Sequence, residues 1–351
     1  MKWPSHGANP HYLTEKMDLP PVTYDLSVNV NPLGPPKWLK EEWDELYATA
    51  LDYPDPGCGQ LIRVLAEEEG VPGRHLLAGN GASELLMLIG QLFAGKRVLI
   101  VEPTFSEYRT IAGTYGCQVK SVFLTEAEAW RLPVERVVEK ATNADLVVIC
   151  NPNNPTGVHY ELDELLFLLE HMKAHLLVDE AFYDFVEKEP TLLPYVKEFP
   201  RLLVLRSLTK MYAVAGLRIG YLAGDPRLIK KIAAFQPAWS VNGLAQTVGA
   251  QSAQDHEFRR QTREFVKLEK ERMFPEIHRL GFTISNTSVN FYLLGGWPNL
   301  GETLLPYLLE KGIAARHTYN FPGMDGEYLR FSISYREAND ALFETLAGWS
   351  V

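Results

Sequence analysis

Short apolar runs between about residues 75 and 225 constrain the fold of this chain more than any other feature. Strands with one face in water alternate apolar and polar residues, whereas uninterrupted runs of Val, Ile and Leu are typical of strands buried on both faces of a parallel sheet. The runs are Val98–Val101, Leu146–Cys150, Leu176–Val178, Leu202–Leu205 and Ile219–Ala223. Between two of them, Glu161–His171 carries leucines at helical spacing, as a helix that crosses over the sheet requires. The pattern predicts an α/β domain with a mostly parallel sheet.

Polar residues closely follow four of these runs. They are Glu102-Pro103, the turn Asn151–Gly157, Asp179 and Lys210. Ligands of open α/β sheets bind beyond the carboxyl ends of the strands. The sequence therefore predicts one binding site that is built from these four segments.

The pattern changes at both ends of the chain. The first 45 residues are irregular and rich in proline, and we expect them to form an N-terminal arm that packs on a smaller domain. From about residue 240 a long charged helix, Asp255–Leu280, is expected to bend or break near Pro275. Short strands should follow it at Phe282–Ser285, Asn290–Leu294 and Tyr328–Ile333. We predict an arm (1–45), a large domain (46–240) and a small α+β domain (241–351).

Composition limits the classes of function. The net charge of −10 argues against nucleic-acid binding. No apolar run approaches the roughly 18 residues of a membrane span, and the N-terminus has no apolar segment of a secretory signal. Cys58, Cys117 and Cys150 are far apart and form no C-x-x-C pair. We therefore expect a cytoplasmic, reduced protein that has no metal site and binds neither nucleic acid nor membrane.

Lys210 lies in the stretch Ser207-Leu208-Thr209-Lys210, which precedes Gly216-Leu217-Arg218. A lysine amine becomes a nucleophile when its surroundings lower its pKa, and enzymes that use pyridoxal 5'-phosphate hold this aldehyde as a Schiff base with such an amine. The hydroxyls of Ser207 and Thr209 and the guanidinium of Arg218 are suited to the cofactor phosphate. A lone S-x-x-K is more often a surface lysine beside a helix cap, but that interpretation leaves the other strand-end residues unexplained.

A glycine-rich segment, Gly79–Glu84, leads straight into the helical pattern Leu85–Phe93. Glycine lets the backbone approach a phosphate, and the free N–H groups of a helix start attract anions. We expect Gly81, Ala82 and Ser83 to contact the cofactor phosphate. Such turns are usually only helix caps, so the segment carries weight only together with the others.

Three further residues fit the remaining parts of the same cofactor. Asn154 could donate to its phenolic oxygen, although a turn of this kind is common after a strand. Asp179 would be a buried carboxylate, which needs a cationic partner such as a protonated pyridine nitrogen. Phe105 could cover the ring face, although an aromatic residue there is more often part of the core.

These residues carry a family resemblance. The chain resembles the class I/II aminotransferases, fold-type-I pyridoxal phosphate enzymes, over nearly its whole length, through Asn153–Gly157, Asp179–Phe182, Ser207–Lys210 and Gly216–Arg218 in this order. Within that family it is similar to the histidinol-phosphate aminotransferase group and, more closely, to the threonine-phosphate decarboxylases of cobalamin synthesis. The stretches that favour the second group are His6–Asn9, Ser27–Pro36 and Asn320–Met324.

The resemblance also implies roles for residues outside these motifs. Tyr53 should reach the cofactor phosphate of the neighbouring subunit, which implies a homodimer with shared active sites. Arg330 should bind the substrate carboxylate, and Asn154 should also face the substrate. The far phosphate of the substrate should be bound by Arg316, with His6, Gly7 and Asn31. The alternatives without a functional role are that Arg330 is solvated and that Arg316 forms a charged surface pair with His317.

Phe182 departs from the family pattern, because relatives commonly place there a tyrosine that supports the cofactor phenolate. Decarboxylase-like relatives tend to have phenylalanine. Tyr183 is next in sequence and should point the other way.

Three hypotheses therefore stay open. The first is a decarboxylase of a phosphorylated amino acid, with O-phospho-L-threonine as the leading candidate. The second is a transaminase of histidinol phosphate or an amino acid that uses 2-oxoglutarate. The third is a non-catalytic regulatory relative that binds the cofactor, against which the complete set Asn154, Asp179 and Lys210 argues.

Overall fold

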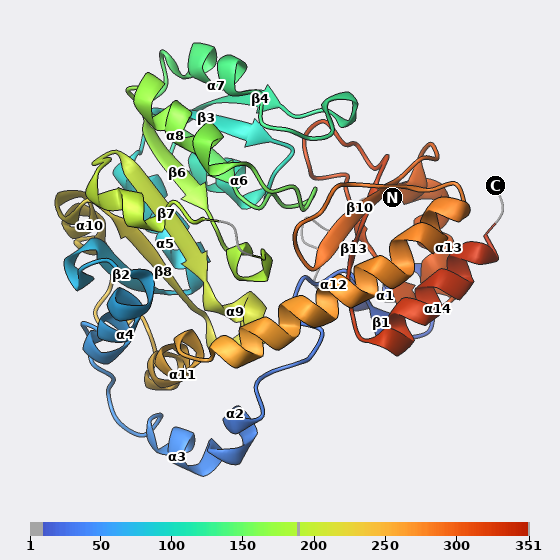
Figure 1. Ribbon diagram of the computed structural model, residues 1–351, viewed down its shortest axis with the longest axis horizontal. Helices are drawn as coiled ribbons and strands as arrows, with labels where there is room; N and C mark the ends of the chain where they lie inside the picture. The colour runs from blue at the N-terminus through green and yellow to red at the C-terminus, as the bar shows by residue number, and fades with distance from the viewer. Residues whose placement is uncertain (1–9, 188–189, 350–351) are drawn as a thin grey trace.

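A seven-stranded sheet is the largest element of the computed structural model, which describes residues 10–187 and 190–349 (Figure 1). The strand order is β2-β8-β7-β6-β5-β3-β4. β8 is antiparallel to both neighbours, and the other neighbouring pairs are parallel. The strands are β2 (Leu76–Asn80), β3 (Arg97–Glu102), β4 (Gln118–Phe123), β5 (Leu146–Cys150), β6 (His175–Asp179), β7 (Leu202–Ser207) and β8 (Ile219–Gly224). The prediction of a mostly parallel α/β sheet is confirmed.

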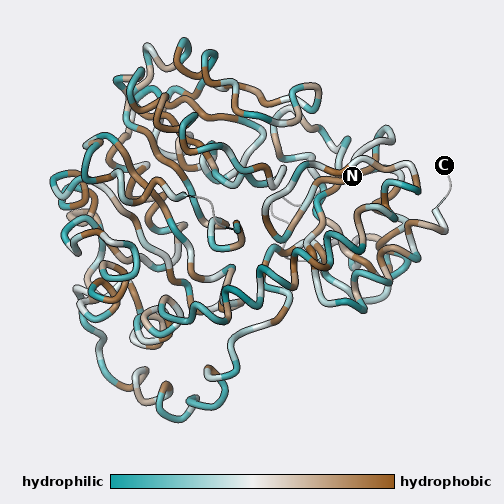
Figure 2. The backbone as a smooth tube through the Cα atoms, in the orientation of Figure 1, coloured by the Kyte–Doolittle hydropathy of each residue, from teal (hydrophilic) through white to brown (hydrophobic). Residues whose placement is uncertain are grey.

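Helices cover both faces of this sheet, which is why its strands lack polar alternation. In β3, Val98 and Ile100 pack with one set of helices, and Leu99 and Val101 pack with the other. The first set is α5 (Gly81–Leu92), α6 (Glu107–Thr114) and α10 (Pro226–Ala233); the second is α4 (Gly59–Glu69), α7 (Val134–Ala141), α8 (Leu162–His171) and α11 (Gly243–Ala253). α8 is the predicted crossover helix. Figure 2 shows the hydrophobic strands enclosed between these layers.

The sequence did not predict the two outermost strands, β2 and β4. β4 lies at the sheet edge, and only Val122 of its six residues is buried. β2 has the sequence Leu-Leu-Ala-Gly-Asn, and its glycine weakens the strand pattern. Edge strands need no continuous apolar run, because one side of their ladder and part of their faces meet water.

A second apolar core lies at the other end of the molecule (Figure 1). It is built on the antiparallel sheet β12-β13-β10-β9 and three helices. Its elements are β9 (Thr283–Ile284), β10 (Phe291–Gly295), β12 (Arg316–His317), β13 (Leu329–Ser332), α12 (His256–Arg279), α13 (Leu300–Glu310) and α14 (Arg336–Ala347). β1 (Tyr24–Asp25) pairs with β11 (Ile313–Ala314), and Leu26 belongs to this core. The division at residues 45 and 240 stays a prediction, because α11 and Phe291 of β10 belong to the core of the large sheet.

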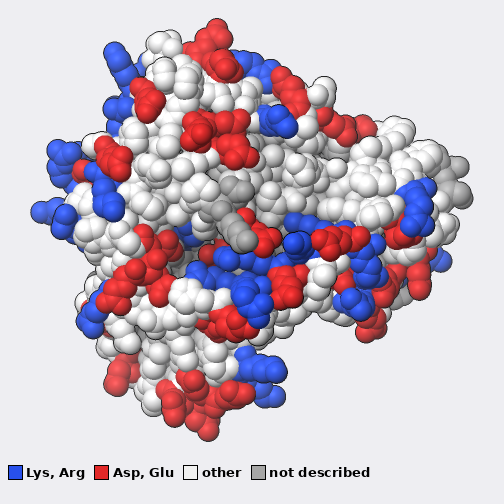
Figure 3. Space-filling model, viewed as in Figure 1, with Lys and Arg blue, Asp and Glu red and all other residues white. Residues whose placement is uncertain are grey.

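The long helix α12 does not break at Pro275, where the sequence suggested a bend or a break. Proline removes one helical N–H donor, which costs stability. Met273 and Ile277 on either side are both buried in the second core, so tertiary packing holds this segment helical. The outer surface of α12 is hydrophilic, and Figure 3 shows acidic and basic side chains mixed along it. Within the described ranges, no helix is long and apolar enough to cross a membrane.

The remaining helices are short. α1 (His11–Met17) lies near the second core, whereas α2 (Trp38–Glu41) and α3 (Trp43–Ala48) lie on the segment that leads to the large sheet (Figure 1). α9 (Leu208–Met211) directly follows β7 and carries Lys210.

Candidate active site

A cavity of about 220 Å³ lies at the carboxyl ends of β6 and β7, between the two cores. Its wall contains eleven of the residues that the sequence singled out: Ala82, Ser83, Phe105, Asn154, Asp179, Ser207, Thr209, Lys210, Arg218, Arg316 and Arg330. They come from segments as far apart as residues 82 and 330. Three of the four predicted segments, those with Asn154, Asp179 and Lys210, therefore meet at one site. The fourth does not, because Glu102 and Pro103 do not line the cavity and the Glu102 carboxylate accepts from Arg109 and Ser121 instead.

Lys210 reaches the cavity from the first turn after β7. Burial first, and the positive charges of Arg330 and Arg218 second, lower the pKa of its amine to about 8. A larger fraction of the amine is therefore neutral near physiological pH than in a free lysine. This is the state in which it can attack an aldehyde.

Asp179 ends β6 and is buried. The hydroxyl of Tyr108 donates to its Oδ2 at 2.5 Å, and the backbone N–H of Ala181 donates to its Oδ1 at 2.9 Å. Burial nevertheless raises the pKa of Asp179 to about 6. A cationic ring nitrogen opposite this carboxyl would stabilise its ionised form.

Tyr108 is a residue that sequence reasoning missed. It lies in the stretch Pro103–Tyr108, from which only Phe105 was selected. The two rings meet edge to face with centroids 5.6 Å apart, and both line the cavity. A tyrosine one helical turn after Phe105 could have been considered, but only the fold shows that its hydroxyl reaches Asp179.

The start of α5 forms a cradle for an anion together with Arg218. Gly81 has φ +76°, and a Cβ there would come within 2.6 Å of the Arg218 guanidinium. Ser207 Oγ and Thr209 Oγ1 lie 2.8 Å apart, and both residues line the same cavity. Helix N–H groups, two hydroxyls and a guanidinium are suited to a phosphate group.

Asn154 and Arg330 meet across the cavity. Arg330 donates from Nη1 to Asn154 Oδ1 at 2.6 Å and from Nη2 to the carbonyl of Ser27 at 2.7 Å. Because an arginine only donates, the Asn154 oxygen faces Arg330 and the Asn154 amide nitrogen is left for a ligand acceptor. Burial lowers the pKa of Arg330 to about 9, and the nearby charge of Arg316 acts in the same direction.

Arg316 lies in β12, and only 5% of it is exposed. Its Nη2 donates to Asn320 Oδ1 at 2.6 Å, and its guanidinium lies 5.2 Å from the ring centre of Phe321. Burial lowers its pKa to about 10. Its Nη1 also lies 2.9 Å from His317 Nε2, so the two residues do pair, but both are buried and the alternative of a pair on the surface is wrong.

Three expected residues of the described part of the chain, Gly81, Asn31 and Tyr53, do not line this cavity. The amide of Asn31 donates to the Met211 carbonyl and to Thr262 Oγ1, both at 2.6 Å. It therefore binds the backbone of the residue that follows Lys210 instead of facing a substrate. His6 and Gly7 lie outside the described residues. Tyr53 is 85% exposed and packs on Trp239, so its proposed contact with a neighbouring subunit stays a prediction.

The structure puts Asn29 in the wall where Asn31 was expected. Asn29 is buried, and neither its amide nitrogen nor its amide oxygen has a hydrogen-bond partner among the described residues. A buried amide without partners is costly unless a ligand supplies them. Both asparagines occur in Asn29-Val30-Asn31, and the sequence alone could not separate their roles.

Phe182 lines the cavity and packs edge to face on Phe291. Tyr183 points away from it and lies under the Arg206 guanidinium, 4.0 Å from the ring centre. Tyr183 therefore does not supply the hydroxyl that Phe182 lacks. This agrees with the prediction that Tyr183 points the other way.

An amine of lowered pKa, a buried carboxyl group, an amide donor, an aromatic face and a phosphate cradle together match the groups of pyridoxal phosphate. The large sheet and this site define a pyridoxal phosphate enzyme of fold type I. When bound, this cofactor supplies an electron sink for the electron pair released at the substrate Cα.

Comparison with known proteins agrees with this class. The model of the family "Aminotransferase class I and II" matches residues 22–346, and the chain belongs to this family. The threonine-phosphate decarboxylase of Salmonella typhimurium is 32% identical over 97% of this chain and 95% of its own length. Histidinol-phosphate aminotransferase 1 of Bacillus cereus is also 32% identical, over 92% of this chain and 87% of its own length. The protein is thus a pyridoxal phosphate-dependent enzyme of the lyase or transaminase type.

A solved structure agrees as well. The L-threonine-O-3-phosphate decarboxylase of Porphyromonas gingivalis superimposes with a TM-score of 0.81 at 26% identity, over 93% of this chain and 98% of that one.

Proposed function

We propose that this enzyme decarboxylates a phosphorylated amino acid, with O-phospho-L-threonine as the candidate substrate. The observation that carries the proposal is the pair Arg316 and Arg330, both buried in one wall of the cavity. The carboxylate of an amino acid needs one such arginine. A second buried guanidinium, beyond Arg218 at the cofactor phosphate, implies that the substrate carries a second anionic group.

Each residue then has a separate role. Arg330 binds the substrate carboxylate, and Arg316 with Asn29 binds the substrate phosphate. Asn154 donates its free amide N–H to the cofactor oxygen, and Asp179 holds the ring nitrogen protonated. Lys210, whose pKa of about 8 lets it exchange protons near neutrality, delivers to Cα the proton that replaces the lost carboxylate.

Binding the substrate at both ends supports decarboxylation over transamination. The bond that breaks is the one held perpendicular to the cofactor ring, because only that bond overlaps the electron sink. Two arginine contacts restrict rotation about the Cα–N bond far more than one does. Phe182 supports the same assignment, since the family resemblance implies that decarboxylase-like relatives tend to have phenylalanine at this position.

The test is product identity with the purified holoenzyme. We expect carbon dioxide and a phosphorylated amine from O-phospho-L-threonine, with no oxo acid added, and L-threonine should react far more slowly. Arg316→Ala should remove most of that preference, whereas Arg227→Ala, which changes an exposed arginine on α10, should not. Transfer of the amino group from histidinol phosphate to 2-oxoglutarate, without carbon dioxide, would instead establish an aminotransferase.

We also propose a homodimer with shared active sites. Tyr53 and Trp239 form an exposed aromatic pair outside this chain's own cavity, and Trp43, Tyr47 and Leu51 are exposed on the same stretch of chain. Large apolar side chains of this kind are typical of a protein interface.

A further inference from the structure

Asn320 connects the loop after β12 to the segment that precedes α6. Its Oδ1 accepts from Arg316 Nη2 at 2.6 Å, and its Nδ2 donates to Ser106 Oγ at 3.2 Å. The orientation of this amide follows from its partner, because a guanidinium has only donors and the atom facing it must be the oxygen. The amide nitrogen therefore faces Ser106.

This orientation determines what the hydroxyl of Ser106 can do. Since its oxygen accepts from Asn320, its own proton must point elsewhere. Ser106 is the N-cap of α6 but makes no side-chain capping bond, and within the described ranges its hydroxyl proton has no acceptor. Ser106 lines the same cavity as Arg316.

We infer that Ser106 is a further substrate-binding residue that donates its hydroxyl proton to the distal phosphate beside Arg316. Asn320 is the positioning residue that orients both donors. This inference rests on the proposed function, and it assigns the site to a phosphomonoester dianion, which accepts several charge-assisted hydrogen bonds at once. Ser106 thereby contributes to the discrimination between phosphorylated and unphosphorylated substrates.

The matched ligands for the test are 1-aminopropan-2-yl phosphate, the amine that decarboxylation of O-phosphothreonine would leave, and 1-aminopropan-2-ol. They differ only in the phosphate, and binding can be measured without turnover. Titration calorimetry with the holoenzyme gives both dissociation constants, and their ratio is the phosphate preference. In Ser106→Ala we expect this preference to fall by about tenfold, as for a lost hydrogen bond to a charged group. The affinity for the unphosphorylated amine should stay within twofold.

Asn320→Asp separates orientation from simple loss of contact. The new carboxylate would accept from both Arg316 and Ser106, so it would neutralise one donor and turn the other away from the cavity. We expect a larger fall in preference than in Ser106→Ala. The control is Thr110→Ala, which removes an exposed hydroxyl from the same helix, where it bonds only to the Ser106 carbonyl.

The outcomes separate this inference from the proposed function. A wild-type enzyme that does not prefer the phosphorylated amine overturns both. A wild-type enzyme that prefers it, with unchanged preference in Ser106→Ala, overturns the role of Ser106 alone. An equal loss for both amines in Ser106→Ala would indicate a structural role and also overturn the inference.

Discussion

At the scale of single residues, the electrostatics of Lys210 governs how the cofactor is captured. Its pKa is lowered from 10.5 to about 8 by burial first and by Arg330 and Arg218 second. Only the neutral amine attacks the aldehyde, so the rate of cofactor capture should rise with pH up to about 8 and then level off. The measurement is the growth of visible absorbance when stripped protein is mixed with pyridoxal phosphate.

A variant tests the stated cause of that pKa. Arg330→Met removes one nearby positive charge, so the midpoint of the capture rate should move to higher pH. A rate that still increases tenfold per pH unit above pH 9 in the wild type would contradict a lowered lysine pKa.

Lys210→Ala should abolish both the visible absorbance of the linked cofactor and turnover. The fold should remain, because the amine makes no packing contact that the core requires. Absorbance, carbon dioxide release and thermal unfolding check the three statements. Wild-type absorbance that survives dialysis of the variant would show that the linkage lies elsewhere.

Asp179→Asn should keep the cofactor bound but lower turnover by about 100-fold or more, the size typical of a lost electrostatic group in an active site. A neutral amide cannot hold the ring nitrogen protonated. Equilibrium dialysis gives cofactor retention, and steady-state kinetics give turnover. Near-normal turnover would reduce Asp179 to a structural residue at the end of β6.

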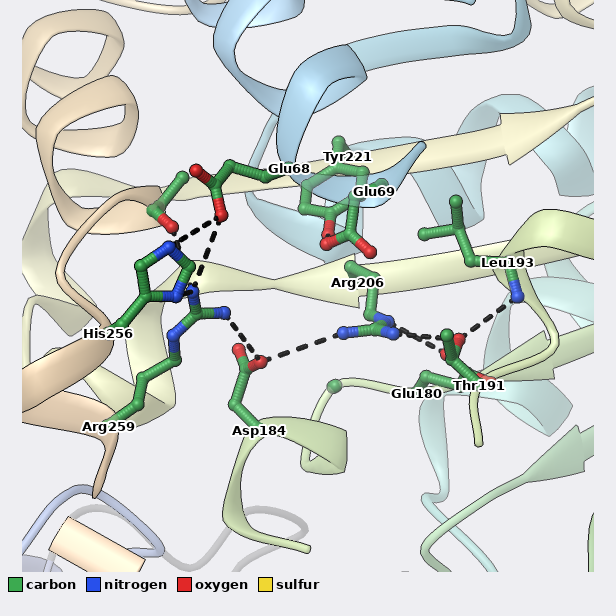
Figure 4. Close-up of polar contacts among 12 residues, drawn as sticks. Glu68, Glu69, Glu180, Asp184, Thr191, Leu193, Arg206, Tyr221, His256 and Arg259 are labelled. Atoms are coloured by element: carbon green, nitrogen blue, oxygen red, sulfur yellow. Dashed lines mark hydrogen bonds and ion pairs between the residues drawn. The ribbon is translucent and has the colours of Figure 1, made fainter. Parts of the chain in front are cut away.

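At the scale of elements, a buried ion pair anchors the segment that follows Asp179. Arg206 on β7 donates to Glu180 at 2.8 Å, and their side chains are 4% and 2% exposed. Figure 4 shows that Asp184 links Arg206 to Arg259 on α12. The strand end that carries Asp179 is therefore tied to the helix that leads to the second core.

Removing one member of a buried pair leaves the other charge without compensation. Arg206→Met should lower the free energy of unfolding by about 3–5 kcal/mol. Arg97→Met, which breaks the exposed pair with Asp145, should cost at most about 1 kcal/mol. Urea unfolding followed by fluorescence and circular dichroism measures both, and similar losses in the two variants would argue against this anchoring role.

At the scale of the whole molecule, the shared-site proposal predicts complementation between two defective subunits. Lys210→Ala loses the cofactor linkage, and Tyr53→Ala should weaken the phosphate contact in the neighbouring subunit. A mixed dimer would keep one site with both residues intact. Up to half of its sites should therefore bind the cofactor with wild-type affinity. Co-refolded mixtures titrated with pyridoxal phosphate measure this.

The control mixture pairs Lys210→Ala with Tyr47→Phe, another exposed tyrosine in the same region. In this mixture, the Tyr47→Phe subunits should bind the cofactor with the same affinity as they do in a sample of Tyr47→Phe protein alone. A monomeric wild-type protein in sedimentation, or no recovery in the Tyr53 mixture, would count against shared sites.

The sequence by itself determined the class of fold and the part of the cavity wall that the strand ends build. Continuous apolar runs identify strands covered on both faces, because burial acts on every residue of such a strand. Asp179 and Lys210 could be selected because each follows a run directly or closely, and the carboxyl ends of these strands meet at one edge. For these two residues, the position in the sequence relative to a strand was sufficient to predict that they line the cavity.

Only the tertiary structure decided which residues complete the cavity from a distance. Asn29 and Asn31 are chemically identical and two residues apart, yet one faces the cavity and the other holds the Met211 carbonyl. The bond from Tyr108 to Asp179 and the bridge from Arg316 through Asn320 to Ser106 join segments 71 and 214 residues apart. A hydrogen bond depends on distances of a few tenths of an ångström, which the packing of the two cores sets and which sequence spacing does not encode.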